Sequence, residues 1–293
     1  MSSIETLPAP RLTVGATRLV RLSRRCWRLA WIVLHLLAGV AAAQILLLGP
    51  NASLPRAHVH RMQRAVVRWW VRGLSRILRL DVRVRGALPT RTSLLVTNHV
   101  SWLDIPALLS VLDAAFVAKQ DVGHWPLIGG MAARAGTIFL ARGQRNAAKH
   151  TADGMTWRLA QRRHVILFPE ATTSDGRGVR RFYARLYQAA VRTHSRIQAV
   201  AIRYPNLDGP QGAAPFIDDD ELVSHLWRLL GEKRIVAELH FCDPILPDAD
   251  RRTLADRTRG QICAALGFEP ELARPLSAKL RFPRQKPATR RAA

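Results

Sequence analysis

The sequence predicts an α/β domain that follows a pair of N-terminal, membrane-associated helices. Residues 29–48 form an apolar run without formal charge, and residues 57–80 repeat apolar and basic positions with a helical period. From residue 81 to about residue 247, short runs rich in β-branched residues alternate with helical periods. Such alternation is typical of a domain in which helices cover a sheet.

The apolar run at residues 29–48 is just long enough to span a bilayer. Its clearly polar side chains are His35 and Gln44, and small residues suited to cleavage stand at Ala41–Ala43. Because the run continues past them to Leu48, we expect an uncleaved membrane element. Six arginines precede it, as in a signal anchor: Arg11, Arg18, Arg21, Arg24, Arg25 and Arg28. Arginines also follow it, so the charge pattern leaves open whether the helix crosses the bilayer or lies in one leaflet.

The helix expected at residues 57–80 is basic and amphipathic. Its apolar positions recur three and four residues apart: Val66, Val67, Trp70, Leu74, Ile77 and Leu78. Arginines take other positions: Arg61, Arg64, Arg68, Arg72, Arg76 and Arg79. A surface helix packed on its own domain and a helix at a lipid surface both fit this pattern. The position directly behind an apolar run favours the lipid surface, where each arginine near an anionic leaflet contributes about 1 kcal/mol.

The predicted elements divide the chain into three parts. Strands are expected at residues 82–85, 93–97, 115–118, 137–141, 164–168, 197–203 and 235–241. Further helices are expected at residues 106–112, 144–162, 182–194, 219–230 and 250–266. We therefore assign residues 1–80 to membrane-anchoring helices, 81–272 to the α/β domain and 273–293 to a basic tail. The tail has seven cations and no acidic residue, a composition typical of disorder.

The composition limits the partners and the chemistry. The chain holds 45 Lys and Arg against 21 Asp and Glu, so it attracts anionic partners such as membrane lipid, nucleic acid or an acidic carrier protein. The cations are spread along the chain rather than gathered on one recognition helix, and we expect no nucleic-acid partner. Three scattered cysteines without a C-x-x-C pair exclude a disulfide framework and give no sign of a zinc or redox site. We expect neither a metal nor a cofactor.

Polar side chains cluster where three of the predicted strands end. Asn98, His99 and Asp104 follow the strand at 93–97, and Arg142 follows the strand at 137–141. A denser group follows the strand at 164–168: Pro169, Glu170, Thr172, Thr173 and Ser174. Ligand sites in open α/β sheets form at the carboxyl ends of the strands. A general base, a cation and a carboxylate can therefore meet in one crevice.

His99 and Asp104 can pair only if a turn separates them. On a continuous helix, residues five apart lie about 140° apart around the axis. Pro106 places the helix start near Leu103 or Asp104, because proline is tolerated in a first turn, and His99 then lies in the preceding loop. The carboxylate can fold back to orient the imidazole as a general base. The alternative is that Asp104 caps the helix and His99 is an ordinary hydrogen-bonded histidine.

Four segments of the chain share a pattern with one enzyme family. Asn98–Asp104 reads N-H-V-S-W-L-D, and Gly136–Arg142 reads G-T-I-F-L-A-R behind Lys119, Pro126 and Gly129. Phe168–Ser174 reads F-P-E-A-T-T-S, and Ala199–Ile202 reads A-V-A-I. In this order they resemble the N-H-x-x-x-x-D, G-x-x-F-x-x-R, F-P-E-G-T-R-S and V-P-V-A-I segments of the PlsC-like glycerolipid and lysophospholipid acyltransferases, which are related to 1-acylglycerol-3-phosphate acyltransferase. The resemblance covers about residues 80–247.

The resemblance implies a fold and a reaction. It implies a mixed sheet flanked by helices, on the cytoplasmic membrane with the active site facing the cytosol. A fatty acyl group passes from acyl carrier protein or coenzyme A to the free hydroxyl of a lyso-lipid. His99 would be the general base, Asp104 would orient it, and Lys119 with backbone N–H groups would stabilise the oxyanion. The residues implied in substrate binding are Asn98, Gly136, Phe139, Arg142, Pro169, Glu170, Thr172, Thr173 and Ser174. Without the resemblance, Arg142 also fits a surface salt bridge, and Glu170 a helix cap.

Three departures from the family pattern bear on the substrate. Ala171 replaces a glycine, Thr173 replaces an arginine and Ala199 replaces a proline. Ala171 is acceptable where the turn does not need a positive φ. Thr173 removes a guanidinium that the resemblance places near the acceptor's phosphate. The T-T-S-D-G variant is similar to relatives that acylate lyso-ornithine lipid. Phosphatidate formation is therefore the first expectation and lyso-ornithine lipid acylation the alternative; a non-enzymatic basic adaptor is the alternative of another class.

Overall fold

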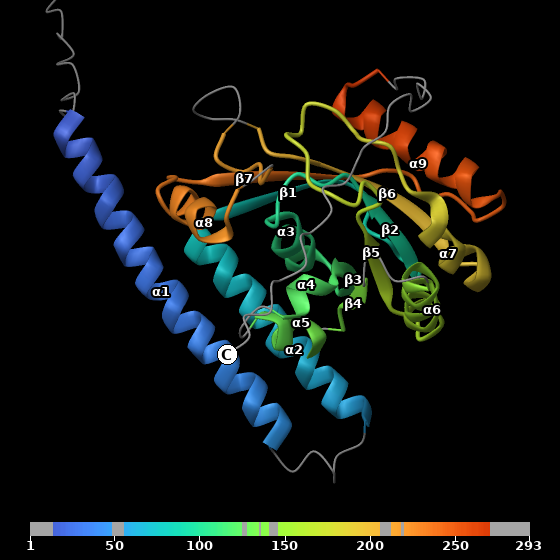
Figure 1. The fold of residues 1–293 in the computed structure, drawn as a ribbon, viewed down its shortest axis with the longest axis horizontal. Coiled ribbons are helices and arrows are strands. Elements are labelled where there is room, and N and C mark those ends of the chain that lie inside the picture. Colours follow the sequence, from blue (N-terminus) through green and yellow to red (C-terminus); the bar gives the residue numbers. More distant parts are fainter. Residues whose placement is uncertain are drawn as a thin grey trace, which may run out of the picture.

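One mixed sheet of seven strands organises the computed structural model, which describes residues 14–48, 56–124, 128–134, 136–140, 146–205, 212–217 and 220–269 (Figure 1). The strands are β1 (Leu80–Gly86), β2 (Ser93–Thr97), β3 (Ala114–Lys119), β4 (Ile138–Leu140), β5 (His164–Leu167), β6 (Arg196–Arg203) and β7 (Ile235–Phe241). Their order is β1-β7-β6-β2-β5-β3-β4. All neighbours are parallel except β6 and β7. The predicted α/β class and mixed sheet are confirmed, with β2 and its loop near the centre.

The helices follow the prediction in most places. They are α1 (Val14–Leu48), α2 (Arg56–Leu78), α3 (Asp104–Val111), α4 (Gln120–Gly123), α5 (Ile128–Arg134), α6 (Ala147–Ala160), α7 (Gln188–Thr193), α8 (Leu222–Leu230) and α9 (Arg251–Leu266). The helix start predicted from Pro106 is found at Asp104. The short helices α4 and α5 were not expected, and the helix expected at 182–194 is a 3-10 turn (Ala184–Tyr187) followed by α7. The predicted tail at 273–293 lies outside the described residues, and the domain boundaries stay predictions.

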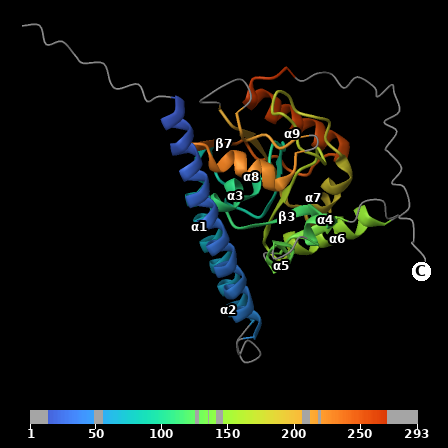
Figure 2. The same ribbon diagram turned by 60° about the vertical axis from the view of Figure 1, so that its left-hand side comes forward.

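Helices cover both faces of the sheet. The alternation of side chains along a strand is visible in β2, where Leu94 and Val96 belong to one buried cluster and Leu95 to the other. The Leu95 cluster includes side chains of α2, α3 and α8, and the Leu94 cluster includes side chains of α6, α7 and α9. Figures 1 and 2 show α1 along one edge of this layered body, away from α9.

The two N-terminal helices form a hairpin that belongs to the fold. His35, a polar residue within the apolar run, pairs through Nε2 with the carbonyl oxygen of Trp70 at 2.8 Å. A Cβ on Gly73 would lie 2.3 Å from the His35 ring, so only glycine permits this helix approach. Ile32 of α1 and Val71 of α2 are buried in the Leu95 cluster. The hairpin therefore contributes to the protein core as well as to the surface.

The arginines of α1 bind the C-terminal end of α8. Arg24 donates to the carbonyl of Gly231 at 2.7 Å, and Arg28 donates to those of Leu230 at 3.1 Å and Glu232 at 2.6 Å. Carbonyl groups at a helix end lack partners within the helix and carry its negative partial charge, so guanidinium groups suit them. This contact gives the basic part of α1 that precedes the apolar run a partner in the folded domain. At least two arginines of the predicted basic flank thus have partners in the folded domain.

We predict that Arg28→Met lowers the free energy of unfolding by about 2–3 kcal/mol, because hydrogen bonds to a charged group contribute about 1.5–3 kcal/mol and several are lost together. Arg28 is 8% exposed. The matched control is Arg21→Met, which removes an ion pair to Glu232 from a side chain that is 50% exposed. Such an exposed pair contributes about 0–1 kcal/mol. Denaturant unfolding in detergent measures both variants, and equal destabilisation would contradict the assigned role of Arg28.

Candidate active site

The site begins where β2 ends, and Asn98 fastens that end to the sheet. The Asn98 side chain donates to the carbonyl of Ile202 in β6 at 2.9 Å and accepts from its N–H at 2.7 Å. Asn98 is 1% exposed. Because both of its polar atoms engage the backbone of β6, this side chain fixes the position from which the next residue, His99, projects.

His99 and Asp104 are paired. The His99 Nδ1 atom lies 2.7 Å from Oδ2 of Asp104, which is fully buried at the start of α3. The same oxygen accepts the backbone N–H groups of Val100 at 2.8 Å and Ser101 at 3.1 Å. The carboxylate thus closes the loop before α3 while orienting the imidazole. Accepting several donors at once suits an ionised carboxylate, so Nδ1 of His99 carries the proton.

Tyr204 is a further partner of Asp104 that the sequence analysis missed. Its hydroxyl donates to Oδ1 of Asp104 at 2.7 Å, so both carboxylate oxygens are engaged. Burial, followed by the charge of Asp104, raises the pKa of Tyr204 well above its ordinary value, which keeps the hydroxyl protonated as a donor. Tyr204 directly follows β6, the neighbour of β2. The signal in the sequence is a polar residue directly after a strand, as at the end of β2.

The loop after β5 holds the backbone of His99. The Glu170 carboxylate accepts the N–H of His99 at 3.0 Å and that of Arg180 at 3.2 Å, and Glu170 is 3% exposed. Burial raises the pKa of Glu170, and these hydrogen bonds oppose the rise. Ser174 donates to the His99 carbonyl from its backbone N–H at 2.8 Å and its hydroxyl at 3.2 Å. The geometry gives both side chains positioning contacts; direct contact with the acceptor stays a prediction.

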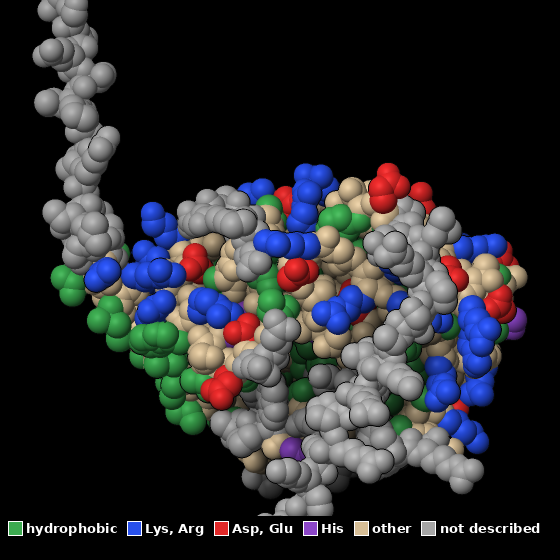
Figure 3. All heavy atoms as spheres, turned by 45° about the horizontal axis from the view of Figure 1, so that its top comes forward, with side chains coloured by type: hydrophobic (Ala, Val, Ile, Leu, Met, Phe, Trp, Pro, Cys, Tyr) green, Lys and Arg blue, Asp and Glu red, His purple; other side chains and the backbone are tan. Residues whose placement is uncertain are grey.

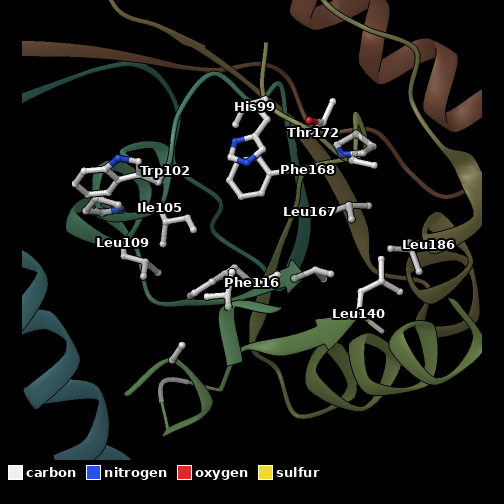
Figure 4. A pocket seen from close by; sticks show the side chains of 18 of the residues that line it. His99, Trp102, Ile105, Leu109, Phe116, Leu140, Leu167, Phe168, Thr172 and Leu186 are labelled. Atoms are coloured by element: carbon white, nitrogen blue, oxygen red, sulfur yellow. The ribbon is translucent and has the colours of Figure 1, made fainter. Parts of the chain in front are cut away.

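His99 opens onto a pocket of about 1000 Å³ (Figure 4). The imidazole stacks on Phe168 with ring centroids 4.1 Å apart. Its Nε2 atom makes no hydrogen bond within the described part of the chain and keeps its lone pair toward the pocket. Trp102, Ile105 and Leu109 line one wall (Figure 4). The lining is largely apolar and extends to α1 and α2 through Ile32, Leu36, Val67, Trp70 and Leu74.

Some of the predicted binding residues line the pocket and others do not. Pro169, Thr172 and Thr173 line the pocket. Among the described residues, five of the predicted set do not line it: Asn98, Gly136, Phe139, Glu170 and Ser174. Gly136 has a φ of +88° and lies against Arg163, where a Cβ would come within 2.5 Å of the guanidinium. Lys119 ends β3, and its side chain lies outside the described residues, as does the whole of Arg142.

Two pairs of arginines also line the pocket. They are Arg181 before and Arg185 within the 3-10 turn, and Arg251 and Arg252 at the start of α9. All four residues are exposed, and Asp256 is the acidic residue among the described lining. The pocket therefore joins an apolar region beside α1 and α2 to a cationic region beside α9. The described residues contain no group of three His, Cys, Asp or Glu arranged to hold a metal.

The turn at Ala171 differs from expectation. The alanine was judged acceptable where φ is not positive, but Ala171 has a φ of +61°. In this left-handed region a Cβ approaches the following carbonyl oxygen, at a cost of about 1–2 kcal/mol relative to glycine. Ala171 also lines the pocket between Glu170 and Thr172. Ala171 thus adopts a backbone conformation that suits glycine better than alanine.

Comparison with known proteins identifies the family. The Acyltransferase family profile matches residues 79–203. The chain is 37% identical to the lyso-ornithine lipid O-acyltransferase of Pseudomonas aeruginosa, over 73% of this chain and 83% of that protein. The chain belongs to this acyltransferase family. It is also 33% identical to the 1-acyl-sn-glycerol-3-phosphate acyltransferase of Neisseria meningitidis serogroup B, over 69% of this chain and 81% of that protein.

A solved structure shares the fold of this acyltransferase. The crystal structure of the 1-acyl-sn-glycerophosphate acyltransferase PlsC from Thermotoga maritima matches with a TM-score of 0.64 at 19% identity. The match covers 86% of this chain and 96% of that one. The fold of the two proteins is thus the same, while the family and its named relatives show that this protein is an enzyme that transfers acyl groups. The non-enzymatic adaptor is excluded as its primary function.

Proposed function

We propose that this acyltransferase moves a fatty acyl group from an acyl carrier protein or coenzyme A thioester to the free hydroxyl of a lyso-lipid, without a metal or cofactor. The observation that carries the proposal is the His99 imidazole, held by the buried Asp104 carboxylate with Nε2 toward a large apolar pocket. One relative is named a lyso-ornithine lipid O-acyltransferase and another a 1-acyl-sn-glycerol-3-phosphate acyltransferase, which supports a lyso-lipid as the acceptor.

In the proposed reaction His99 acts as a general base. Its Nε2 takes the proton of the acceptor hydroxyl as that oxygen attacks the thioester carbonyl. The tetrahedral intermediate collapses, the C–S bond breaks, and the imidazolium returns the proton to the leaving thiolate. Asp104 stabilises the imidazolium between these steps. Lys119 and loop N–H groups are proposed to stabilise the oxyanion.

The lining of the pocket suggests where the apolar and the anionic parts of the substrates bind. Apolar side chains of α1, α2 and α3 suit hydrocarbon chains, and the four lining arginines suit anionic groups. The first acceptor we propose is 1-acylglycerol-3-phosphate, whose phosphate such arginines can bind together with Arg142. The second candidate is lyso-ornithine lipid. It is favoured by Thr173, which lines the pocket where the related pattern has arginine, and by the similarity to the Pseudomonas enzyme.

The hairpin of α1 and α2 is proposed to lie in one leaflet of the cytoplasmic membrane, with the site open to the cytosolic donor. One described helix, over Arg18–Ile45, is long and apolar enough to span a bilayer. Figure 3 shows hydrophobic side chains gathered along the edge formed by α1. Trp27, Leu34 and Leu37 of α1 are exposed. Arginines of α2 run beside the apolar half of α1, and a spanning α1 would carry them into hydrocarbon.

We predict that His99→Ala lowers kcat by about 10²- to 10⁴-fold, because a general base contributes that range. Asp104→Asn is expected to fall between wild type and His99→Ala. Its amide oxygen can still accept from the loop N–H groups while the charge is lost. Release of free thiol from acyl-coenzyme A measures transfer, with the exposed His150→Ala as matched control. Near-full activity of a folded His99→Ala would overturn the mechanism.

We predict that Thr173→Arg raises kcat/KM for 1-acylglycerol-3-phosphate relative to lyso-ornithine lipid by about tenfold, since charge-assisted hydrogen bonds to phosphate contribute about 1.5–3 kcal/mol. Thr173→Gln controls for side-chain size without charge. Mass spectrometry of products from mixed acceptors gives the ratio directly and also names the preferred acceptor of the wild type. A ratio equal in the two variants would show that this position does not select the head group.

We predict that the wild type stays in the membrane pellet after a high-salt wash, because burial of apolar surface is not screened by salt. The triple variant Trp27→Glu, Leu34→Glu and Leu37→Glu is expected to move largely to the supernatant. Trp157→Glu is the matched control, because Trp157 is equally apolar and 54% exposed on α6, away from α1. If the triple variant sediments like wild type, the α1 surface does not attach the protein.

A further inference from the structure

A buried histidine of α8 supports the loop that carries the proposed dyad. His225 is fully buried, and its Nδ1 accepts the indole N–H of Trp102 at 3.0 Å. Its Nε2 pairs with the carbonyl oxygen of Pro215 at 3.0 Å. Phe216 packs edge-on against the same imidazole, with ring centroids 5.2 Å apart. Every polar atom of the ring therefore has a partner.

These partners fix the protonation state of His225. An indole N–H only donates and a carbonyl oxygen only accepts, so Nδ1 is unprotonated and Nε2 carries the hydrogen. Burial, followed by the charge of Arg228, lowers the pKa of His225 and keeps the ring neutral. Asp220 also acts on the ring, and it is paired with Arg228 at 2.9 Å. The arrangement is that of a fixed neutral support rather than an acid or base.

Trp102 connects this support to the reaction pocket. It lies between His99 and Asp104 in the chain, and its indole lines the pocket wall beside Ile105 (Figure 4). Any change in the indole position moves this wall and strains the short loop that sets the dyad geometry. The second hydrogen bond of His225, to Pro215, matters less for the position of the loop. The segment of Pro215 is already bound to the loop, because the Phe216 N–H donates to the Val100 carbonyl oxygen at 3.0 Å.

Helix α8, which carries His225, is also held at its C-terminal end. The last residues of α8 and the following carbonyls are bound by Arg24 and Arg28 of α1. The helix therefore lies between the N-terminal hairpin on one side and the dyad loop on the other. His225 is the side chain through which α8 meets Trp102.

We propose that His225 is a positioning residue for acyl transfer, whose Nδ1 holds the Trp102 indole and thereby the loop of His99 and Asp104 in reactive geometry. The proposal rests on the proposed function of the dyad. The side chain does not line the pocket itself, so it acts through its neighbours, and Trp102 is the one that its hydrogen bond holds. Misplacement of a catalytic group by about 1 Å can cost about 10²-fold in rate, which sets the scale of the effect.

Two amide substitutions separate the two hydrogen bonds of the ring. In His225→Asn the amide oxygen takes the place of Nδ1 and can accept from Trp102. In His225→Gln the amide lies at the place of Nε2 and retains only the partner at Pro215. We expect His225→Gln to lower kcat by about 10- to 100-fold with little change in KM, while His225→Asn stays within about threefold of wild type.

The full-length protein in detergent or nanodiscs serves for all measurements. Besides thiol release, NMR of the ¹⁵N-labelled indole groups follows the Trp102 N–H, assigned by its loss in Trp102→Phe. This N–H is expected to exchange slowly in wild type and His225→Asn and rapidly in His225→Gln. In the Trp102→Phe background, His225→Gln should cause no additional loss of kcat, because the bond it breaks is already absent.

Three results would overturn the proposal: full activity of His225→Gln, equal loss in the Asn and Gln variants, or an additive loss in the Trp102→Phe background. His99→Ala is measured in parallel. If that variant stays active, the proposed dyad mechanism fails, whereas the Asn and Gln contrast in indole exchange still reports whether the support exists. The two failures are thus distinguishable.

Discussion

The carboxylate of Asp104 accepts four hydrogen bonds, and the geometry of the active site depends on them. Two come from backbone N–H groups of the loop before α3, one from the His99 imidazole and one from the Tyr204 hydroxyl. A charge buried without such partners would be costly, so the loop, the histidine and the end of β6 are held together around it. Asp104 does not cap α3, whose N-cap position is Leu103 without a side-chain cap bond. One of its oxygens instead closes the preceding loop and orients the His99 imidazole.

Other buried polar side chains hold the backbone on either side of His99. Asn98 binds the backbone of β6, and Glu170 and Ser174 bind the backbone of His99. These buried polar groups satisfy one another and leave a single imidazole nitrogen facing the pocket. Preorganisation of this kind lowers the reorganisation needed during proton transfer. Asn98, Glu170 and Ser174 thus act on the position of His99 without lining the pocket.

The N-terminal hairpin contributes one face to the folded domain and exposes the other. One face of α1 packs on α2 and α8 and contributes Ile32 and Leu36 to the core and the pocket, while the other face exposes apolar residues. The pocket is therefore partly built from the element proposed to contact lipid. In the proposed reaction, a lyso-lipid acceptor need not leave an apolar environment to bring its hydroxyl to His99, and the arginines on the side of α9 suit the anionic groups of the substrates.

The sequence by itself determined the α/β class, the seven strands to within two residues at each end, and the start of α3, because hydrophobic period and proline position are local signals. It also identified His99 and Asp104, since the loop between them is short. Tertiary structure alone decided which partners complete the site. Tyr204 and His225 are distant in the chain from the residues they hold, and only the packing of β6 and α8 beside the loop brings them there. The backbone angle of Ala171 and the binding of the α1 arginines to α8 likewise depend on neighbours far along the chain, which no local pattern records.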